Sequence, residues 1–181
     1  TGDLFILQAR PETAQARDVA RGAPLRHLVE ASRVLVRGRS VGTGIALGPV
    51  RLVHGPEEPF ADGSILVTEM TDPDWLPLMR RAAAVVTDHG GRTCHAAILS
   101  RELGIPAVVG TGDATTKLVD GAEVTVSCAS GDEGLVHEGR LRFEETPAEP
   151  YVPMHTATRV LLNLADPGSA LRHWRLPADG I

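Results

Sequence analysis

The residues best suited to chemistry lie between Thr87 and Ile98, in the sequence Thr-Asp-His-Gly-Gly-Arg-Thr-Cys-His-Ala-Ala-Ile. The apolar run before them predicts a buried strand, and the residues from Cys94 to Leu103 predict a helix. His95 would then lie in the first turn of this helix, where free N–H groups and the positive end of the helix dipole favour an anion. An imidazole there could bond covalently to a phosphoryl group, because it offers a neutral nucleophilic nitrogen at neutral pH.

The neighbours of this histidine suit the same chemistry. Gly90 and Gly91 would let the backbone approach closely between strand and helix, and Arg92 could add a positive charge. Thr93 belongs to a residue type that caps helices, and we expect it to be the N-cap. The small side chains of Ala96–Ala97 would leave room for a bulky phosphoryl donor.

The same segment allows other interpretations. A histidine in a first helical turn after two glycines is often only part of a polar surface. Cys94 could itself be a nucleophile, since a helix N-terminus favours the thiolate, with His89 as its base, although no third group is placed to orient that base. A metal could be held by His89, Cys94, His95 and Cys128, although their spacing matches no usual zinc pattern. The remaining histidines, which we expect on the surface, are His54, His137, His155 and His173.

The rest of the sequence predicts an α/β domain of short strands around this segment. Hydrophobic residues make up 43% of the 181 residues but aromatic ones only 3%, so we expect an aliphatic core, and 19 Gly and 13 Pro predict many turns. A short helix should follow Asp72 or Asp74, and Pro77 favours Asp74 as the cap because it then falls in the first turn. Gly104 should end the helix that carries the histidine. Strands are expected near residues 40–53, 63–69, 82–87, 107–110, 123–128 and 135–137.

Charge and composition exclude several classes of function. A net charge of −5 is unlike that of a nucleic-acid-binding domain. Apolar runs such as Ala82–Val86 are far shorter than the roughly 20 residues of a membrane span, and no signal peptide is evident. Two cysteines are too few for a disulfide framework, which favours a reducing cytoplasm while leaving one disulfide open. The first residue is Thr1, so we expect the natural N-terminus to be missing or processed.

Two stretches around the histidine carry a resemblance to a known family. Gly90–Ile98 and Arg101–Gly110 closely resemble the phosphohistidine signature of the phosphoenolpyruvate (PEP)-utilising enzymes. This family includes PEP synthases, pyruvate phosphate dikinases, rifamycin phosphotransferases and enzyme I of the sugar phosphotransferase system. The resemblance implies a swivelling β/β/α domain in which His95 carries the phosphoryl group, on Nε2. At position 89 relatives often have another residue type than His, and we have no account of His89.

Further stretches resemble the synthase branch of this family. Thr71–Trp75 and Val124–Cys128 are more similar to the synthases than to the dikinases or enzyme I. Gln8–Thr13 resembles the closing strand of the family's ATP-grasp nucleotide domain. Arg159–Ile181 resembles the opening of its PEP/pyruvate-binding TIM barrel, and a barrel after the histidine domain argues against the rifamycin phosphotransferases.

These resemblances divide the chain into five parts. We expect the end of an ATP-grasp domain at 1–13, a linker at 14–35, the phosphohistidine swivelling domain at 36–143, a second linker at 144–157 and the start of the barrel at 158–181. The expected partners of the histidine domain are therefore the ATP-grasp and barrel domains of its parent. Because most of both is missing, we expect the chain alone to accept phosphoryl groups in trans at most, without complete turnover.

The resemblance also implies a reaction and its cofactors. The parent would convert ATP, pyruvate and water to AMP, PEP and phosphate with Mg²⁺. His95 would take the β,γ portion of ATP as a pyrophosphoryl group, lose orthophosphate, and pass the remaining phosphoryl group to pyruvate enolate. Gln8 and Arg10 match positions near the ATP phosphates. Thr93 matches the threonine that the family's regulatory kinase/phosphorylase phosphorylates, and a dianion there would repel an incoming phosphate.

Two alternatives to a synthase remain open at this point. A pyruvate phosphate dikinase would differ in needing orthophosphate as a co-substrate. A docking or regulatory module could have kept the fold and lost the chemistry, although an intact His95 with Gly90 and Gly91 speaks against it.

Overall fold

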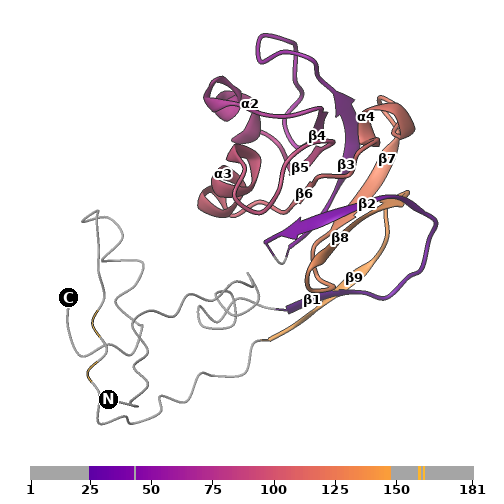
Figure 1. The fold of residues 1–181 in the computed structure, drawn as a ribbon. Coiled ribbons are helices and arrows are strands. Elements are labelled where there is room, and N and C mark those ends of the chain that lie inside the picture. The colour runs from indigo at the N-terminus through magenta and orange to yellow at the C-terminus, as the bar shows by residue number, and fades with distance from the viewer. Residues whose placement is uncertain (1–24, 43, 148–158, 160, 162–181) are drawn as a thin grey trace.

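The computed structural model describes residues 25–42, 44–147, 159 and 161. Within them, seven strands close into a barrel in the order β2-β6-β5-β4-β3-β7-β8 (Figure 1). The expected ATP-grasp segment at 1–13 and nearly all of the expected barrel segment from 158 onward lie outside the described residues. The strands of the closed barrel are β2 Val34–Val41, β3 Ile45–Leu52, β4 Ile65–Thr68, β5 Ala84–Thr87, β6 Ala107–Val109, β7 Glu123–Ser127 and β8 Glu133–Glu138.

The parallel part of the barrel is its most buried part. Strands β3, β4, β5 and β6 run parallel to one another, and every residue of β4, β5 and β6 is buried. Alternate side chains serve two cores: Val86 faces the barrel interior, whereas Val85 packs in the outer cluster with Met79 and Ala97. Burial on both faces requires continuous apolar sequence, as predicted for 82–87.

Helices cover one side of these parallel strands (Figure 1). They are the 3-10 helix η1 Pro73–Trp75, α2 Leu76–Met79 and α3 His95–Leu103. A separate short helix, α4 Ala114–Lys117, was not expected from the sequence. The preference for Asp74 as the cap was wrong, because the Asp72 carboxylate accepts a hydrogen bond from the Asp74 amide at 2.9 Å. The 3-10 turn places Pro77 in the first turn of α2 without a cap at Asp74. Gly104 ends α3 in the left-handed conformation, as predicted.

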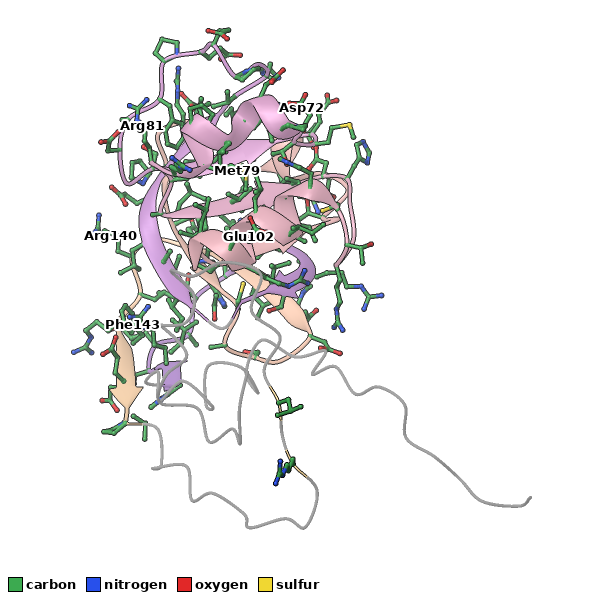
Figure 2. The ribbon with its side chains drawn as sticks, turned by 90° about the vertical axis from the view of Figure 1, so that its left-hand side faces the viewer. Asp72, Met79, Arg81, Glu102, Arg140 and Phe143 are labelled. Carbon is green, nitrogen blue, oxygen red and sulfur yellow. The ribbon has the colours of Figure 1, made fainter. Side chains whose placement is uncertain are left out.

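A two-stranded antiparallel ribbon lies outside the barrel, at the opposite end of the described domain from Asp72 and α2 (Figure 2). It pairs β1 Leu25–Leu28 with β9 Phe143–Thr146. Parts of both predicted linkers therefore have strand structure. Arg26 Nε contacts Glu145 Oε1 at 2.8 Å, and the Arg26 guanidinium lies 5.6 Å from the Phe143 ring centre.

His137 was wrongly expected on the surface. It is buried on β8, opposite Thr125 of β7, and neither ring nitrogen has a hydrogen-bond partner. His54 is exposed, as predicted. In the part of the chain that the structure describes, no helix has the length and apolar character needed to cross a membrane.

Candidate functional site

The candidate site lies where two parallel strands end. β5 ends at Thr87 and β6 at Val109, and α3 begins from the loop that follows β5. The Gly90 φ angle is +120°, and a Cβ atom on Gly90 would lie 2.8 Å from Cys94 Sγ. A Cβ atom on Gly110 would lie 2.6 Å from the Gly90 carbonyl oxygen. Only glycine fits at these two positions, and the loop therefore lies directly against the end of β6.

Gly91 differs from Gly90 in this respect. It does not have a positive φ, and a Cβ atom on it would meet nothing within 4 Å. The expectation that both glycines allow a close backbone approach therefore holds for Gly90 alone.

Helix α3 begins without a side-chain cap. Cys94, not Thr93, is the N-cap residue, with an extended backbone at φ −69° and ψ 164°. The Cys94 amide bonds back to the Gly91 carbonyl at 3.0 Å, and this turn delays the helix start by one residue. The first helical bond runs from the Ile98 amide to the Cys94 carbonyl at 3.0 Å. Within the described residues, the amides of His95, Ala96 and Ala97 have no hydrogen-bond partner and can bind an anion.

His95 is the first residue of α3 and is partly buried. Its Nδ1 atom is buried and has no hydrogen-bond partner among the described residues. Nε2 is not among the buried unpartnered atoms and makes no hydrogen bond there either, so it is the ring nitrogen that solvent reaches. The accessible nucleophilic atom of this side chain is therefore Nε2.

The Arg92 side chain forms an ion pair with the turn that precedes β8. Its Nη2 atom lies 2.5 Å from Oδ1 of Asp132, in the turn before β8. The Asp132 backbone carbonyl in turn accepts a hydrogen bond from the Ser40 amide of β2 at 3.0 Å. The carboxylate that holds Arg92 is thus fixed to the barrel by its own main chain.

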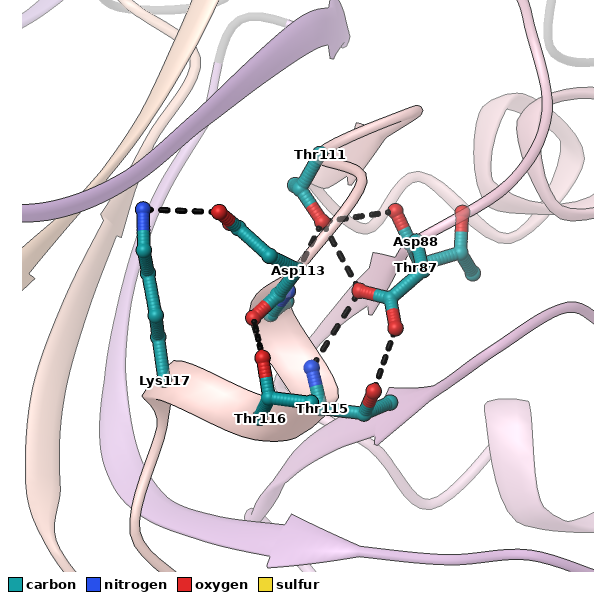
Figure 3. A network of polar contacts seen from close by, with 8 residues as sticks. Thr87, Asp88, Thr111, Asp113, Thr115, Thr116 and Lys117 are labelled. Carbon is teal, nitrogen blue, oxygen red and sulfur yellow. Dashed lines mark hydrogen bonds and ion pairs between the residues drawn. The ribbon is translucent and has the colours of Figure 1, made fainter.

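Asp88, which the sequence did not single out, holds the start of the same loop (Figure 3). Its side chain is only 6% exposed. It accepts hydrogen bonds from the Thr111 hydroxyl at 3.1 Å, from the Thr115 amide at 3.2 Å and from the Thr115 hydroxyl. Burial raises the pKa of Asp88, but these bonds and the Ala114 amide outweigh it, so that the pKa lies below its ordinary value. The carboxylate is therefore ionised and joins the loop after β5 to α4.

The alternative catalytic and metal groupings are not assembled. No hydrogen bond links Cys94 to His89 within the described residues, and His89 is exposed. Cys94 and Cys128 are both free, and burial raises the pKa of the Cys128 thiol, which donates to the Ala107 carbonyl at 3.2 Å. No three His, Cys, Asp or Glu side chains of residues 25–42 and 44–147 are grouped to hold a metal ion.

The fold and the site define a class of protein: a small barrel domain that presents a histidine at a helix N-terminus able to bind an anion. Residues 60–131, which include His95, match the family described as PEP-utilising enzyme, mobile domain. The segment that carries His95 is therefore similar to the mobile domain of the PEP-utilising enzymes. Gln8 and Arg10 lie outside the described residues, so their predicted place near ATP stays a prediction.

Curated relatives cover the whole chain. It is 50% identical over 180 residues to the phosphoenolpyruvate synthase of Deinococcus radiodurans, which covers 98% of this chain and 23% of the relative. It is 45% identical over 183 residues to that of Synechocystis sp., covering 100% of this chain and 22% of the relative. The chain thus spans less than a quarter of the length of these relatives. A solution structure of Enzyme I aligns with 45% of this chain and 33% of its own, at 29% identity and a TM-score of 0.37, too low to support an argument.

Proposed function

We propose that this chain is the phosphoryl-carrier part of a phosphoenolpyruvate synthase and that His95 carries the group on Nε2. The observation that carries the proposal is the environment of His95: Nδ1 is buried, Nε2 is accessible, and the ring stands at a helix start whose first amides are free. The identity to synthases over nearly the whole chain supports the same activity.

The surroundings of His95 suit a transferred phosphoryl group. The Nε2 lone pair attacks phosphorus, and the negative charge on the phosphoryl oxygens is stabilised by the α3 dipole and by the amides of His95, Ala96 and Ala97. Arg92 supplies the nearest cation in sequence, three residues before the nucleophile. Gly110 lets the Gly90 carbonyl lie directly against the end of β6, which holds the start of α3 in place.

The proposed parent reaction converts ATP, pyruvate and water to AMP, PEP and phosphate. His95 takes the β,γ portion of ATP and releases AMP, water then removes orthophosphate, and the remaining phosphoryl group passes to pyruvate enolate. Mg²⁺ neutralises charge on the phosphates when it is bound. From the family resemblance we assign Mg²⁺, ATP and pyruvate to other parts of the parent, with Gln8 and Arg10 near the ATP phosphates.

Movement between two partner domains is the second part of the proposal. The pairing of β1 with β9 places Leu25 opposite Thr146. Both flanking segments therefore meet the domain at one place, and the domain between them can turn as a body. The partners on either side are the parent's ATP-grasp domain and its PEP/pyruvate-binding barrel.

Thr93 is the proposed regulatory site for a kinase/phosphorylase. Its side chain is exposed and makes no hydrogen bond within the described residues, so its hydroxyl is available for modification. A phosphate there would lie at the same helix start as His95, compete for the same free amides and repel an incoming phosphate. Because Cys94 is the N-cap residue, Thr93 has no capping role to lose.

The alternative functions require different substrates or different features of the site. A pyruvate phosphate dikinase needs orthophosphate as a substrate, whereas the synthase releases it. A docking module that has lost the chemistry does not need an accessible Nε2 beside free amides. Both cysteines are free thiols, which fits the proposed cytoplasmic location.

The test uses the full-length parent that carries this chain. The parent is incubated with ATP and Mg²⁺ without pyruvate and digested at alkaline pH, where phosphohistidine survives. We expect a phosphoryl or pyrophosphoryl mass on the peptide with His95, in the wild type and in His89→Ala, and none in His95→Ala. His89 is a matched control, an exposed histidine six positions earlier. Label retained in His95→Ala would overturn the assignment, and discharge to PEP that requires orthophosphate would favour a dikinase.

A further inference from the structure

The ion pair between Arg92 and Asp132 is the most informative contact of the site that the family signature does not contain. With other described residues, 91–93 make one backbone hydrogen bond, from the Cys94 amide to the Gly91 carbonyl. Their one side-chain polar contact within the described residues is the 2.5 Å pair of Arg92 with Asp132. The guanidinium of Arg92, three residues before the nucleophile in sequence, is therefore located by a carboxylate 40 positions away in the chain.

Asp132 is suited to this task because its main chain is fixed. Its carbonyl accepts the Ser40 amide of β2, and the next residue, Glu133, pairs with Arg39 in the sheet register. The Asp132 side chain is 64% exposed whereas that of Arg92 is only 29% exposed. A partly buried arginine is thus paired with a carboxylate whose main chain is hydrogen-bonded to β2.

We propose that Asp132 is a positioning residue: it holds the Arg92 guanidinium beside His95, ready to bind the oxygens of the incoming phosphoryl group. This inference rests on the proposed function of His95. An arginine that is free in solvent loses rotamer entropy when it binds a phosphate, and an arginine already held loses less. When the phosphoryl group arrives, Arg92 exchanges part of its contact with Asp132 for the phosphoryl oxygens.

The direction in which the phosphorylation rate changes when the Asp132 charge is removed distinguishes this positioning role from simple charge repulsion. Phosphoryl donors are anions, so the removal of a negative charge near the site should speed their reaction if charge alone matters. The positioning role predicts the reverse, because an unheld Arg92 binds the donor less well. Glu133 provides the matched control: it is the next residue, 53% exposed, and pairs with Arg37 at 3.1 Å rather than with Arg92.

The experiment measures phosphorylation of the 181-residue chain by phosphoramidate, a small donor that needs no partner domain. Nε2 of His95 forms the new N–P bond as the P–N bond of phosphoramidate breaks, and ammonia leaves. The rate constant is followed by intact mass at alkaline pH, and circular dichroism establishes that each variant is folded. The His95→Ala variant identifies the phosphorylated residue.

We expect Asp132→Asn to react about fivefold more slowly than the wild type, which is about 1 kcal/mol at 1.36 kcal/mol per factor of ten. Glu133→Gln should match the wild type or exceed it slightly. Asp132→Glu, which keeps the carboxylate, should restore at least half of the rate. In an Arg92→Gln background, Asp132→Asn should cause no further loss, because Asp132 acts through Arg92.

Two results would overturn the inference. One is an Asp132→Asn chain that reacts as fast as the wild type or faster, and the other is a loss of rate that persists in the Arg92→Gln background. Failure of the proposed function has a different signature: the wild type itself would gain no phosphoryl group that disappears in His95→Ala.

Discussion

The buried carboxylate of Asp88 offers a direct measure of how firmly the site loop is held. We predict that Asp88→Asn lowers the free energy of unfolding by about 2 kcal/mol at pH 7. Asparagine keeps one acceptor oxygen for the Thr111 hydroxyl and the Thr115 amide. Its amide nitrogen replaces the oxygen that accepts from the Thr115 hydroxyl, so that bond is lost as it stands.

The magnitude follows from the burial and charge of the group. A hydrogen bond to an ionised partner contributes about 1.5–3 kcal/mol, and the two bonds that remain lose their charge assistance. Only 6% of Asp88 is exposed, so water cannot replace the lost contact. The Thr115 hydroxyl can rotate to accept a hydrogen bond from the new amide, which keeps the cost near that of a single bond.

The effect has a defined pH dependence. The pKa of Asp88 is lower in the folded chain than its ordinary value of about 3.9, so the unfolded chain binds the proton more readily. The stability from this carboxylate is therefore present above about pH 4 and is lost as the pH falls through the folded pKa. The difference between wild type and Asp88→Asn should accordingly be constant between pH 7 and pH 5 and shrink below pH 4.

Urea unfolding followed by circular dichroism at pH 7, 5 and 3 measures these differences. Asp113→Asn is the matched control in the same polar network (Figure 3). Asp113 is 44% exposed and its carboxylate pairs with Lys117 at 2.7 Å, so its loss should cost under about 0.5 kcal/mol. Equal costs for the two variants at pH 7, or a cost for Asp88→Asn that does not change at low pH, would refute the reasoning.

Three further predictions concern the loop and the two thiols. Gly90→Ala should cost about 2–3 kcal/mol in chemical denaturation, because of its φ of +120° and the contact with Cys94 Sγ, whereas Gly91→Ala should cost under about 1 kcal/mol. Thr93→Val should change stability by under about 0.5 kcal/mol, and Thr93→Glu should slow His95 phosphorylation at least about tenfold. A thiol reagent should modify partly exposed Cys94 in the native chain and buried Cys128 only after unfolding; equal rates would contradict the burial.

The strands and the helix that form the site could be predicted from the sequence because their signals are local. β4, β5 and β6 are short continuous apolar runs, which is what strands buried on both faces require. The start of α3 follows a glycine turn and its end has a left-handed glycine. The N-cap was misplaced by one residue because the bond between Cys94 and Gly91 is a property of the folded turn, not of residue type.

The β1–β9 ribbon could not be found in this way. Its two strands have four residues each, and its partners Arg26 and Glu145 lie 119 positions apart. Neither segment shows the alternation of a half-buried strand, so each was assigned to a linker. His137 was missed for a related reason, since its burial depends on what covers the outer face of β8 and not on its own neighbours in sequence.

The residues that react and those that hold them in place differ in how far apart they lie in sequence. Gly90 to His95 are contiguous, and a motif can therefore contain them all. The groups that fix this loop come from elsewhere: Thr115 of α4 through Asp88, Gly110 after β6 through the Gly90 carbonyl, and Asp132 before β8 through Arg92. A chain in which Gly90 to His95 are intact can thus lose its activity through substitutions at Thr115, Gly110 or Asp132, and variants at these three positions would show how much of the chemistry depends on the barrel.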